Sequence, residues 1–348
     1  MNVRLSVLDQ SPIPEGSTAS DALHNSIDLA RLADELGYER YWVAEHHATP
    51  GLASASPEVL LGPIGAATKR IRLGSGGVML PHYSPLKVAE SFSALSGLFP
   101  GRIDLGLGRA PGTDPLTMYA LQRDRREASP DDFPQQLAEL LGYLNDNLPE
   151  KFPFARLAKT LPGLPERPDV WLLGSSAQSA AWAAELGLPY SFADFINPNG
   201  AELAKLYRER FLDTPEAPAP RQSVAVWAIC AESEEEAQRL ASSSRMTLRL
   251  LHENRLIPVP PVDKALRFLE SRGTPPEGSM ARSRRGIIGD PDKVRAGIEN
   301  VAREYGAEEV MVVTITHDHG ARRRSYELIA EAFAGASVTG SPSSATAS

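Results

Sequence analysis

Two hydrophobic patterns take turns along the chain: short runs rich in β-branched and aromatic residues, and longer amphipathic runs with helical spacing. Several short runs, such as V-W-L-L at 170–173, are apolar throughout, which is typical of parallel strands covered on both faces. We predict eight strands, at residues 4–9, 40–46, 70–80, 102–108, 169–174, 190–195, 223–231 and 308–316.

The longer runs lie between these strands. The run at 19–37 ends in a glycine typical of a helix C-cap, and the runs at 56–69 and 85–98 begin with Ser-Pro and Pro. Five further helices are predicted, at 131–146, 176–187, 200–212, 233–251 and 290–306. This alternation favours an α/β fold of the (β/α)8 TIM barrel type over a doubly wound open sheet, because there are eight strands and no dinucleotide fingerprint.

Three long segments interrupt the alternation: 109–131 after the fourth strand, 150–168 before the fifth, and 254–285 before the last β/α unit. Loops of this length are usually functional or mobile, so we expect the first and third to form a substrate wall and a lid. We predict a single domain over residues 1–335, followed by a disordered tail of small and polar residues at 336–348.

Composition narrows the function. The chain has 348 residues and a net charge of −8, which argues against a nucleic-acid or anionic-membrane partner. A single cysteine, Cys230, excludes internal disulfides and cysteine-rich metal sites. The N-terminus enters a strand without a signal segment, and no apolar run reaches the length of a membrane span, so we expect a cytoplasmic protein. We interpret two basic clusters, Arg282/Arg284/Arg285 and Arg322–Arg324, as solvated faces or loops.

In a (β/α)8 barrel, catalytic residues come from the C-terminal ends of the strands. The second predicted strand ends in Glu45-His46-His47. Adjacent strand residues point to opposite faces, so the two imidazoles are poorly placed to bind one ion. The other histidines form no metal-binding pattern, and we predict no metal site. A structural histidine pair and a proton-handling role for one imidazole both stay open.

A candidate anion site follows the fifth strand, where Gly174, Ser175 and Ser176 lead into a helix. Backbone N–H groups and hydroxyls at a helix N-terminus suit a phosphate. Arg109, at the end of the fourth strand, would add a charge-assisted contact. The alternative is a plain serine N-cap.

The third strand contains Ser75-Gly76-Gly77. Two glycines weaken a strand, and glycine inside a strand usually marks a bulge or a ligand that approaches the backbone closely. With a phosphate site on the same rim, the residues indicate a barrel enzyme that binds a planar cofactor with a phosphate tail.

These residues also carry a family resemblance. The stretches YWVAEHH, GSGGVMLPHYSPLKVAE, GLGRAPGTD and GSSAQSAAWAAELGLPYSFADFIN resemble those of the bacterial luciferase-like flavin monooxygenases, in particular their single-gene subgroup. The similarity runs from residue 3 to residue 335. It is specific for the superfamily and much less so for the substrate.

The resemblance implies a (β/α)8 barrel that binds reduced FMN, with O2 adding at the flavin C4a position to give a peroxyflavin that oxygenates a small organic substrate. A separate NAD(P)H:FMN reductase would supply reduced FMN, because the chain shows no nicotinamide fingerprint. The resemblance also implies a homodimer, formed through the helices beside the second and third strands.

Residue by residue, the resemblance makes His46 the proton-handling group, with Glu45 and His47 orienting it or completing the wall. It places Gly76-Gly77 under the flavin ring, often joined by a cis peptide bond, with Ser75 beside them. It assigns Arg109 to the phosphate or the ring, and Gly174, Ser175 and Ser176 to the phosphate.

Two positions depart from the luciferase pattern: Gly108 stands where the luciferases have a cysteine, and Ser175 where they have a glutamate. A phosphate pocket without that glutamate is less negative, which fits FMN or a deazaflavin. FMN is preferred because the motifs are closer to those of the FMN-binding members. The alternatives are a deazaflavin-dependent hydride-transfer enzyme and a non-catalytic flavin-binding subunit, and Glu45-His46-His47 argues against the second.

Overall fold

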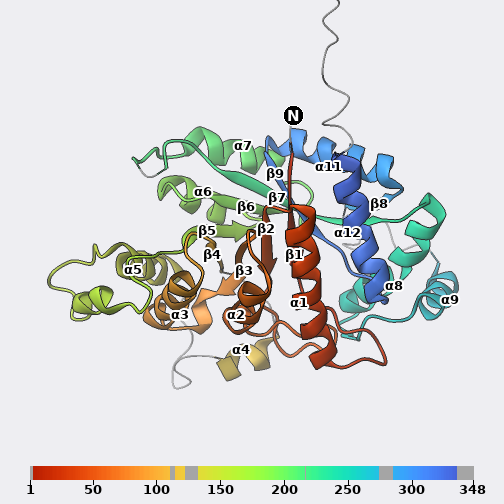
Figure 1. Ribbon diagram of the computed structural model, residues 1–348, viewed down its shortest axis with the longest axis horizontal. Helices are drawn as coiled ribbons and strands as arrows, with labels where there is room; N and C mark the ends of the chain where they lie inside the picture. Colours follow the sequence, from red (N-terminus) through yellow and green to blue (C-terminus); the bar gives the residue numbers. More distant parts are fainter. Residues whose placement is uncertain (1–2, 110–113, 122–131, 216, 274–284, 335–348) are drawn as a thin grey trace, which may run out of the picture.

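The structure, a computed structural model, describes residues 3–109, 114–121, 132–215, 217–273 and 285–334. Eight parallel strands pair in the order β1-β2-β3-β4-β5-β6-β7-β9, and β9 pairs with β1 to close a barrel (Figure 1). The predicted fold class is confirmed. The barrel strands are β1 (Arg4–Asp9), β2 (Arg40–Val43), β3 (Arg72–Met79), β4 (Ile103–Gly108), β5 (Asp169–Gly174), β6 (Tyr190–Ala193), β7 (Gln222–Cys230) and β9 (Glu309–Val313).

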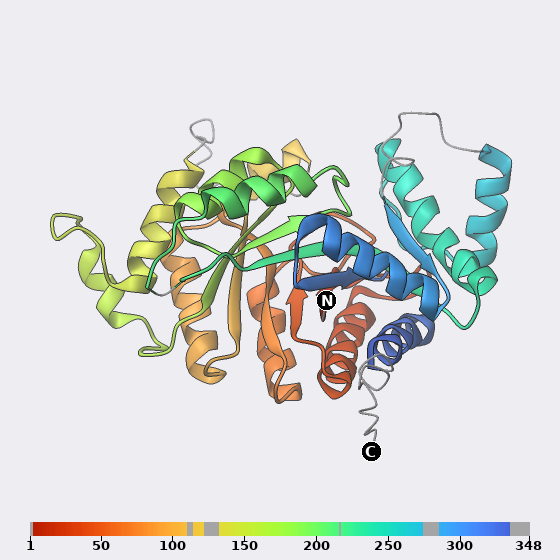
Figure 2. The same cartoon turned by 90° about the horizontal axis from the view of Figure 1, so that it is seen from above.

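All eight predicted helices are present, and Figure 2 shows helices on both sides of the strands. They are α1 (Ala19–Leu36), α2 (Pro57–Ala67), α3 (Pro85–Leu98), α5 (Phe133–Asn145), α6 (Ala177–Glu185), α7 (Ala201–Arg210), α8 (Glu234–His252) and α11 (Pro291–Tyr305). Local signals explain their ends. In α1, Thr18 and Asp21 form a capping box, and Gly37 ends the helix with φ +80°.

The three long segments contain helical structure that we did not predict. They hold α4 (Pro115–Leu121), the 3-10 helix η2 (Ala155–Thr160) and α9 (Val262–Arg272). A further 3-10 helix, η1 (Leu80–His82), follows β3. Helix α9 packs beside α8 at one end of the molecule (Figures 1 and 2). Residues 110–113, 122–131 and 274–284 of these segments, and the predicted tail at 336–348, lie outside the described residues.

Charged residues close the N-terminal end of the barrel. Arg40 is buried and binds the carboxylates of Asp104 and Glu309, each at 2.9 Å. Above it, Trp42 and Trp171 pack edge to face, with ring centroids 5.3 Å apart, and the Trp42 indole donates to Asp104 (3.0 Å). A ligand therefore has access to the barrel interior from the opposite end, where the strands finish.

The structure adds a ninth strand, β8 (Gly286–Gly289), which we did not predict. It pairs with Trp227–Cys230 of β7. The first part of β7, Gln222–Ala225, pairs with β6. Backbone groups of odd-numbered residues bond to both strands: Phe195 N–H donates to the Ala225 carbonyl, and Ala231 N–H donates to the Gly289 carbonyl of β8. Strands β6 and β8 therefore lie along the same edge of β7. Strand β8 thus takes over the edge of β7 at the point where β6 stops.

The Arg322–Arg324 prediction is wrong for Arg322. Helix α12 (His319–Ala334), which is not among the predicted ranges, follows β9 and carries the cluster. The Arg322 side chain is 2% exposed, and its guanidinium binds the buried Asp9 carboxylate at 2.5 Å. Arg323 and Arg324 are part-exposed as expected. In the other cluster, Arg285 pairs with Glu304 (2.6 Å), while Arg282 and Arg284 lie outside the described residues.

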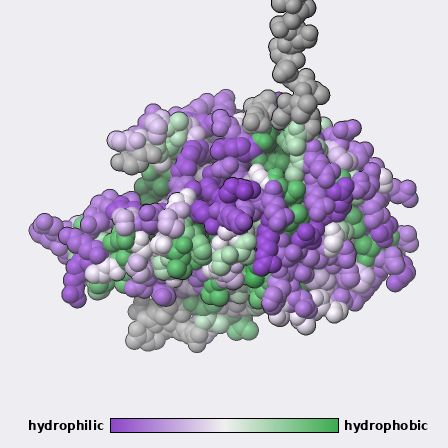
Figure 3. All heavy atoms as spheres, in the orientation of Figure 1, coloured by the Kyte–Doolittle hydropathy of each residue, from purple (hydrophilic) through white to green (hydrophobic). Residues whose placement is uncertain are grey.

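The face shown in Figure 3 is mostly hydrophilic, with hydrophobic residues in scattered small groups. None of the helices within the described ranges has the length and apolar character needed to cross a membrane.

Candidate functional site

The Glu45-His46-His47 segment lies at the open end of the barrel. Strand β2 ends at Val43, three residues earlier than predicted. The His46 backbone N–H donates to the Ser54 carbonyl (2.9 Å), while its ring Nδ1 is buried without a hydrogen-bond partner in the described part of the chain. Burial, with a smaller contribution from His47, lowers the pKa of His46 to about 4. The imidazole of His46 is therefore neutral at neutral pH.

Glu45 connects this segment to the end of β3. Its side chain is fully buried, and its carboxylate accepts three hydrogen bonds. They come from His47 Nε2 (2.7 Å), the Tyr83 hydroxyl (2.9 Å) and the Met79 backbone N–H (3.0 Å). Burial and the neighbouring Glu45 raise the pKa of Tyr83 above its usual value, so its phenol stays protonated.

A cavity of about 570 Å³ opens at the same end of the barrel. Its wall is formed by residues that follow β1, β2, β6 and β9, by one residue of β7, by one face of α8, and by parts of the first and third long segments. They are Gln10, His46, His47, Thr49, Gly51, Leu52, Asp114, Phe195, Ile196, Trp227, Ser244, Thr247, Leu248, Leu251, Asn254, Arg255, Leu256, Ile257, Val259 and Ile315.

Gly76 and Gly77 lie in β3, and the peptide bond between them is cis. The register with β4 shifts between Gly76 and Val78, so this is a bulge. A Cβ on Gly76 would lie 2.4 Å from Leu8 Cδ1, and one on Gly77 would lie 2.4 Å from Leu173 Cδ1. Close packing of the chain on itself thus explains why glycine occupies both positions.

The other predicted cofactor residues lie on the β3–β5 side. Ser75 is fully buried and donates to the Gly106 carbonyl (2.8 Å), which makes it a packing residue. Arg109 lies over the Trp182 ring of α6, 5.5 Å from its centroid. The structure therefore brings Arg109 to the helix that follows Gly174-Ser175-Ser176.

Ser176 is the N-cap of α6. Its hydroxyl accepts from the Ser179 N–H at 3.3 Å, as the plain N-cap alternative requires. Gly174 lets Ser179 approach, since a Cβ there would lie 2.4 Å from Ser179 Oγ. Asn197 donates to the Ser175 carbonyl (3.3 Å) and holds the turn. Capping by Ser176 leaves the other N–H groups of the first turn able to bind an anion.

The predicted site residues thus fall into two groups. Gly76, Gly77, Arg109 and residues 174–176 belong to the β3–β5 side, and His46 lies on the cavity wall. Of the predicted site residues, His46 is the one found among the described residues that line the cavity. No group of three or more potential metal ligands is found within the described residues.

Sequence reasoning missed most of the cavity wall. Ser244, Thr247, Leu248 and Leu251 have the i, i+3, i+4, i+7 spacing that marks one helix face. That signal was available, but the same spacing is typical of a face packed in the core.

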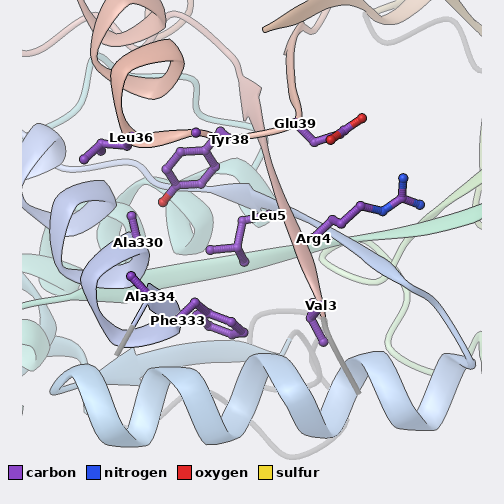
Figure 4. A pocket seen from close by; sticks show the side chains of 10 residues that line it. Val3, Arg4, Leu5, Leu36, Tyr38, Glu39, Ala330, Phe333 and Ala334 are labelled. Atoms are coloured by element: carbon purple, nitrogen blue, oxygen red, sulfur yellow. The ribbon is translucent and has the colours of Figure 1, made fainter. Parts of the chain in front are cut away.

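A second pocket, of about 230 Å³, lies at the opposite end of the barrel (Figure 4). It is lined by the start of β1, the turn between α1 and β2, and the end of α12. Residues at the N-terminal end of a barrel usually serve stability, and none of the predicted site residues lines this pocket.

Comparisons with known proteins agree with this geometry. The model of the luciferase-like monooxygenase family matches residues 3–309. A luciferase-like monooxygenase of Escherichia coli K12 is 42% identical, over 94% of this chain and 96% of that protein. The N-acetyl-S-alkylcysteine monooxygenase of Bacillus subtilis 168 is 37% identical, over 95% and 98%.

Solved structures share the fold. The crystal structure of apo-MsnO8 is 43% identical, covers 96% of this chain and 98% of its own, and superposes with a TM-score of 0.87. The oxygenating constituent of 3,6-diketocamphane monooxygenase from a Pseudomonas putida plasmid, in complex with FMN, has a TM-score of 0.72 at 19% identity. It covers 95% of this chain and 97% of its own. The family match, the relatives and the barrel together show that this chain belongs to the luciferase-like monooxygenase family of flavin-dependent enzymes.

Proposed function

We propose that the protein is an FMN-dependent monooxygenase that uses reduced FMN and O2 to oxygenate a small, largely apolar organic molecule. The observation that carries the proposal is His46, which lines the cavity while its buried Nδ1 has no hydrogen-bond partner in the described part of the chain. A buried polar atom without a partner is costly. A small turn of the ring would let a molecule bound in the cavity satisfy it.

Reduced FMN would supply the electrons that activate O2. Arg109 and the first turn of α6 would hold its phosphate, since a guanidinium and free backbone N–H groups both favour an anion. The bulge at Gly76-Gly77 would let the ring approach the backbone of β3. His46, neutral at working pH, would accept or donate a hydrogen bond at the reacting centre.

The substrate would occupy the cavity beside α8. Phe195, Trp227, Leu248 and Ile315 give it apolar walls that keep water away from the reacting atoms. The relative named N-acetyl-S-alkylcysteine monooxygenase supports a small organic substrate for this chain. Segment 254–259 and Asp114 line the cavity, which supports the predicted substrate wall and lid.

The cofactor is tested by anaerobic titration of the purified protein with reduced FMN and, separately, with a reduced deazaflavin. We expect reduced FMN to bind in the micromolar range or tighter, because phosphate and ring would both be held. If the protein binds the deazaflavin tightly and FMN weakly, the proposal is wrong, and a deazaflavin-dependent hydride-transfer enzyme takes its place. Tight FMN binding with no oxygenation of any thioether, ketone or alkane in a substrate panel would favour the accessory-subunit alternative.

Replacing Arg109 with alanine should weaken FMN binding by about tenfold or more, because a charge-assisted contact to the phosphate is lost. Riboflavin lacks the phosphate, so its affinity should stay nearly constant. Both dissociation constants can be measured by flavin fluorescence. Arg156→Ala, in η2, is the control for loss of a surface positive charge. Equal losses for FMN and riboflavin would contradict the phosphate assignment.

We further propose a cytoplasmic homodimer that receives reduced FMN from a separate NAD(P)H:FMN reductase. Val59 on α2 and Leu98 on α3 are each 69% exposed, and a partner subunit would cover them. Sedimentation of the protein as a monomer at micromolar concentration would contradict the dimer. Steady turnover with NAD(P)H and FMN in the absence of any reductase would contradict the need for one.

A further inference from the structure

Glu45 is placed to control a histidine. A carboxylate with no solvent exposure is costly to bury unless its oxygens accept hydrogen bonds. Met79 N–H donates to Oε2, while the Tyr83 hydroxyl and His47 Nε2 lie at hydrogen-bond distance from Oε1. Because the Met79 donor belongs to the backbone of β3, the orientation of the Glu45 carboxylate is fixed from outside the histidine segment.

The two adjacent histidines differ in what holds them. Both line the cavity, but His46 Nδ1 has no partner within the described residues, whereas His47 Nε2 lies 2.7 Å from Glu45. An ionised carboxylate has no hydrogen to donate, so Glu45 can only accept a hydrogen bond from the imidazole. Nε2 of His47 therefore carries the hydrogen, and in the neutral ring Nδ1 is the basic nitrogen. This is the carboxylate–imidazole arrangement that orients a general base.

Resting on the proposed function, we propose that His47 is a second proton-handling residue of the site and that Glu45 is its positioning residue. The contact of Glu45 with Met79 also sets His47 in register with the strand that carries Gly76-Gly77. The imidazole is thereby held at a constant place relative to the strand against which the flavin ring would bind.

Other ionisable groups face this pair and must be separated from it in any test. Glu58 of α2 lies close enough to Glu45 and His47 to interact with both, and burial raises its pKa. The His82 ring at the end of η1 packs edge to face on His47, with centroids 6.0 Å apart. Tyr83 shares Glu45, and His46 is adjacent in the chain. Glu58→Gln is the matched control, because it removes a nearby carboxylate that does not hydrogen-bond His47.

Nitrogen-15 NMR of the histidine rings in the flavin-free protein tests the positioning. The wild type should show His47 with a hydrogen on Nε2, assigned by comparison with His47→Gln. In Glu45→Gln, the fixed Met79 N–H requires the amide oxygen, so the amide nitrogen must face His47. We expect the ring to change to the Nδ1–H tautomer in this variant and to stay unchanged in Glu58→Gln.

Reoxidation of protein-bound reduced FMN by O2 tests the proton handling. His47→Ala should slow the return of oxidised FMN by about a hundredfold, the usual contribution of a general acid or base. Added imidazole should restore part of that rate. Glu45→Gln should be slowed similarly but not rescued, because the wrongly oriented His47 ring still fills the site. His47→Gln replaces His47→Ala if the alanine variant unfolds.

The outcomes separate the two proposals. Failure of the wild type to bind FMN overturns the proposed function. A wild-type His47 ring with its hydrogen on Nδ1, or an unchanged tautomer in Glu45→Gln, overturns the positioning role whether or not FMN binds. A reoxidation rate in His47→Ala within threefold of wild type, with FMN still bound, overturns the proton-handling role.

Discussion

Replacing Arg322 with methionine should lower the free energy of unfolding by about 3–5 kcal/mol near neutral pH. The guanidinium donates to the Asp9 carboxylate of β1 and to the Thr314 carbonyl after β9, and the two charged groups, Arg322 and Asp9, are both buried. Methionine fills similar volume but leaves the Asp9 carboxylate without its counter-charge. Guanidinium denaturation followed by circular dichroism measures the loss.

The control for this variant is Arg324→Met on the same helix. Arg324 binds three carboxylates, but its side chain is 40% exposed, and exposed ion pairs contribute about 1 kcal/mol or less. A loss in Arg322→Met no greater than that in Arg324→Met would show that the buried pair does not hold β1, β9 and α12 together.

The loss in Arg322→Met should also depend on pH. Burial by itself would raise the pKa of Asp9, but Arg322 and the hydrogen bond from Tyr41 more than offset it, so the pKa is lowered. A carboxyl group whose pKa is lower in the folded than in the unfolded protein stabilises the fold at any pH above its unfolded pKa, which is about 4. This stabilisation is lost as the pH falls through the pKa of the folded protein. The gap between wild type and variant should narrow below about pH 4. A constant gap from neutral to acidic pH would contradict this assignment.

Replacing Gly77 with alanine should lower the free energy of unfolding by about 2–3 kcal/mol. The new Cβ would lie 2.4 Å from Leu173 Cδ1 and 2.7 Å from the backbone oxygen of Gly106. The side chain can move, but the carbonyl belongs to the neighbouring strand and cannot. In Gly76→Ala the nearest atom is the end of the Leu8 side chain, at 2.4 Å, so the cost should be smaller.

Gly62→Ala in α2 is the matched control for these glycine variants. A Cβ there meets nothing within 4 Å apart from its chain neighbours, but Pro63 follows and disfavours helical backbone at a residue with a Cβ. Alanine should therefore change the free energy of unfolding by less than about 1 kcal/mol. Thermal unfolding measures all three proteins. A Gly77→Ala protein as stable as wild type would show that β3 can move away from β4, and a ring site built on that bulge would lose its basis.

The barrel was predictable from the sequence because each barrel strand carries its own short run rich in apolar residues, and a helical pattern separates most of these runs. Strand β8 was missed because G-I-I-G offers two apolar residues, too short a run to separate from a loop. The range of helix α12 was missed because its first six residues, His-Gly-Ala-Arg-Arg-Arg, contain no large apolar residue that would set a helical period. The partner of Arg322 is Asp9, 313 residues away, and no local pattern indicates such a pairing.

The candidate site was predictable where its chemistry is local. The histidines, the glycine pair and the serine turn stand out by composition. The Glu45–Tyr83 contact joins residues 38 positions apart, and the cavity wall combines α8 with Trp227 of β7 and with residues that follow β1, β2, β6 and β9. Those features depend on how the barrel closes, and the periodicity of single elements does not contain that information.

Strand β7 pairs with β6 along the first part of one edge and with β8 along the second part, and the two parts have different structural roles. Hydrogen bonds that close the barrel lie on the first half of β7, and its second half anchors the excursion formed by α8, α9 and β8. Leu248 and Leu251 on that excursion line the cavity without contributing to barrel closure. Substitutions on this face of α8 should therefore retune which molecules the enzyme accepts while the melting temperature of the barrel stays nearly constant, which makes α8 the element to vary in a search for new substrates.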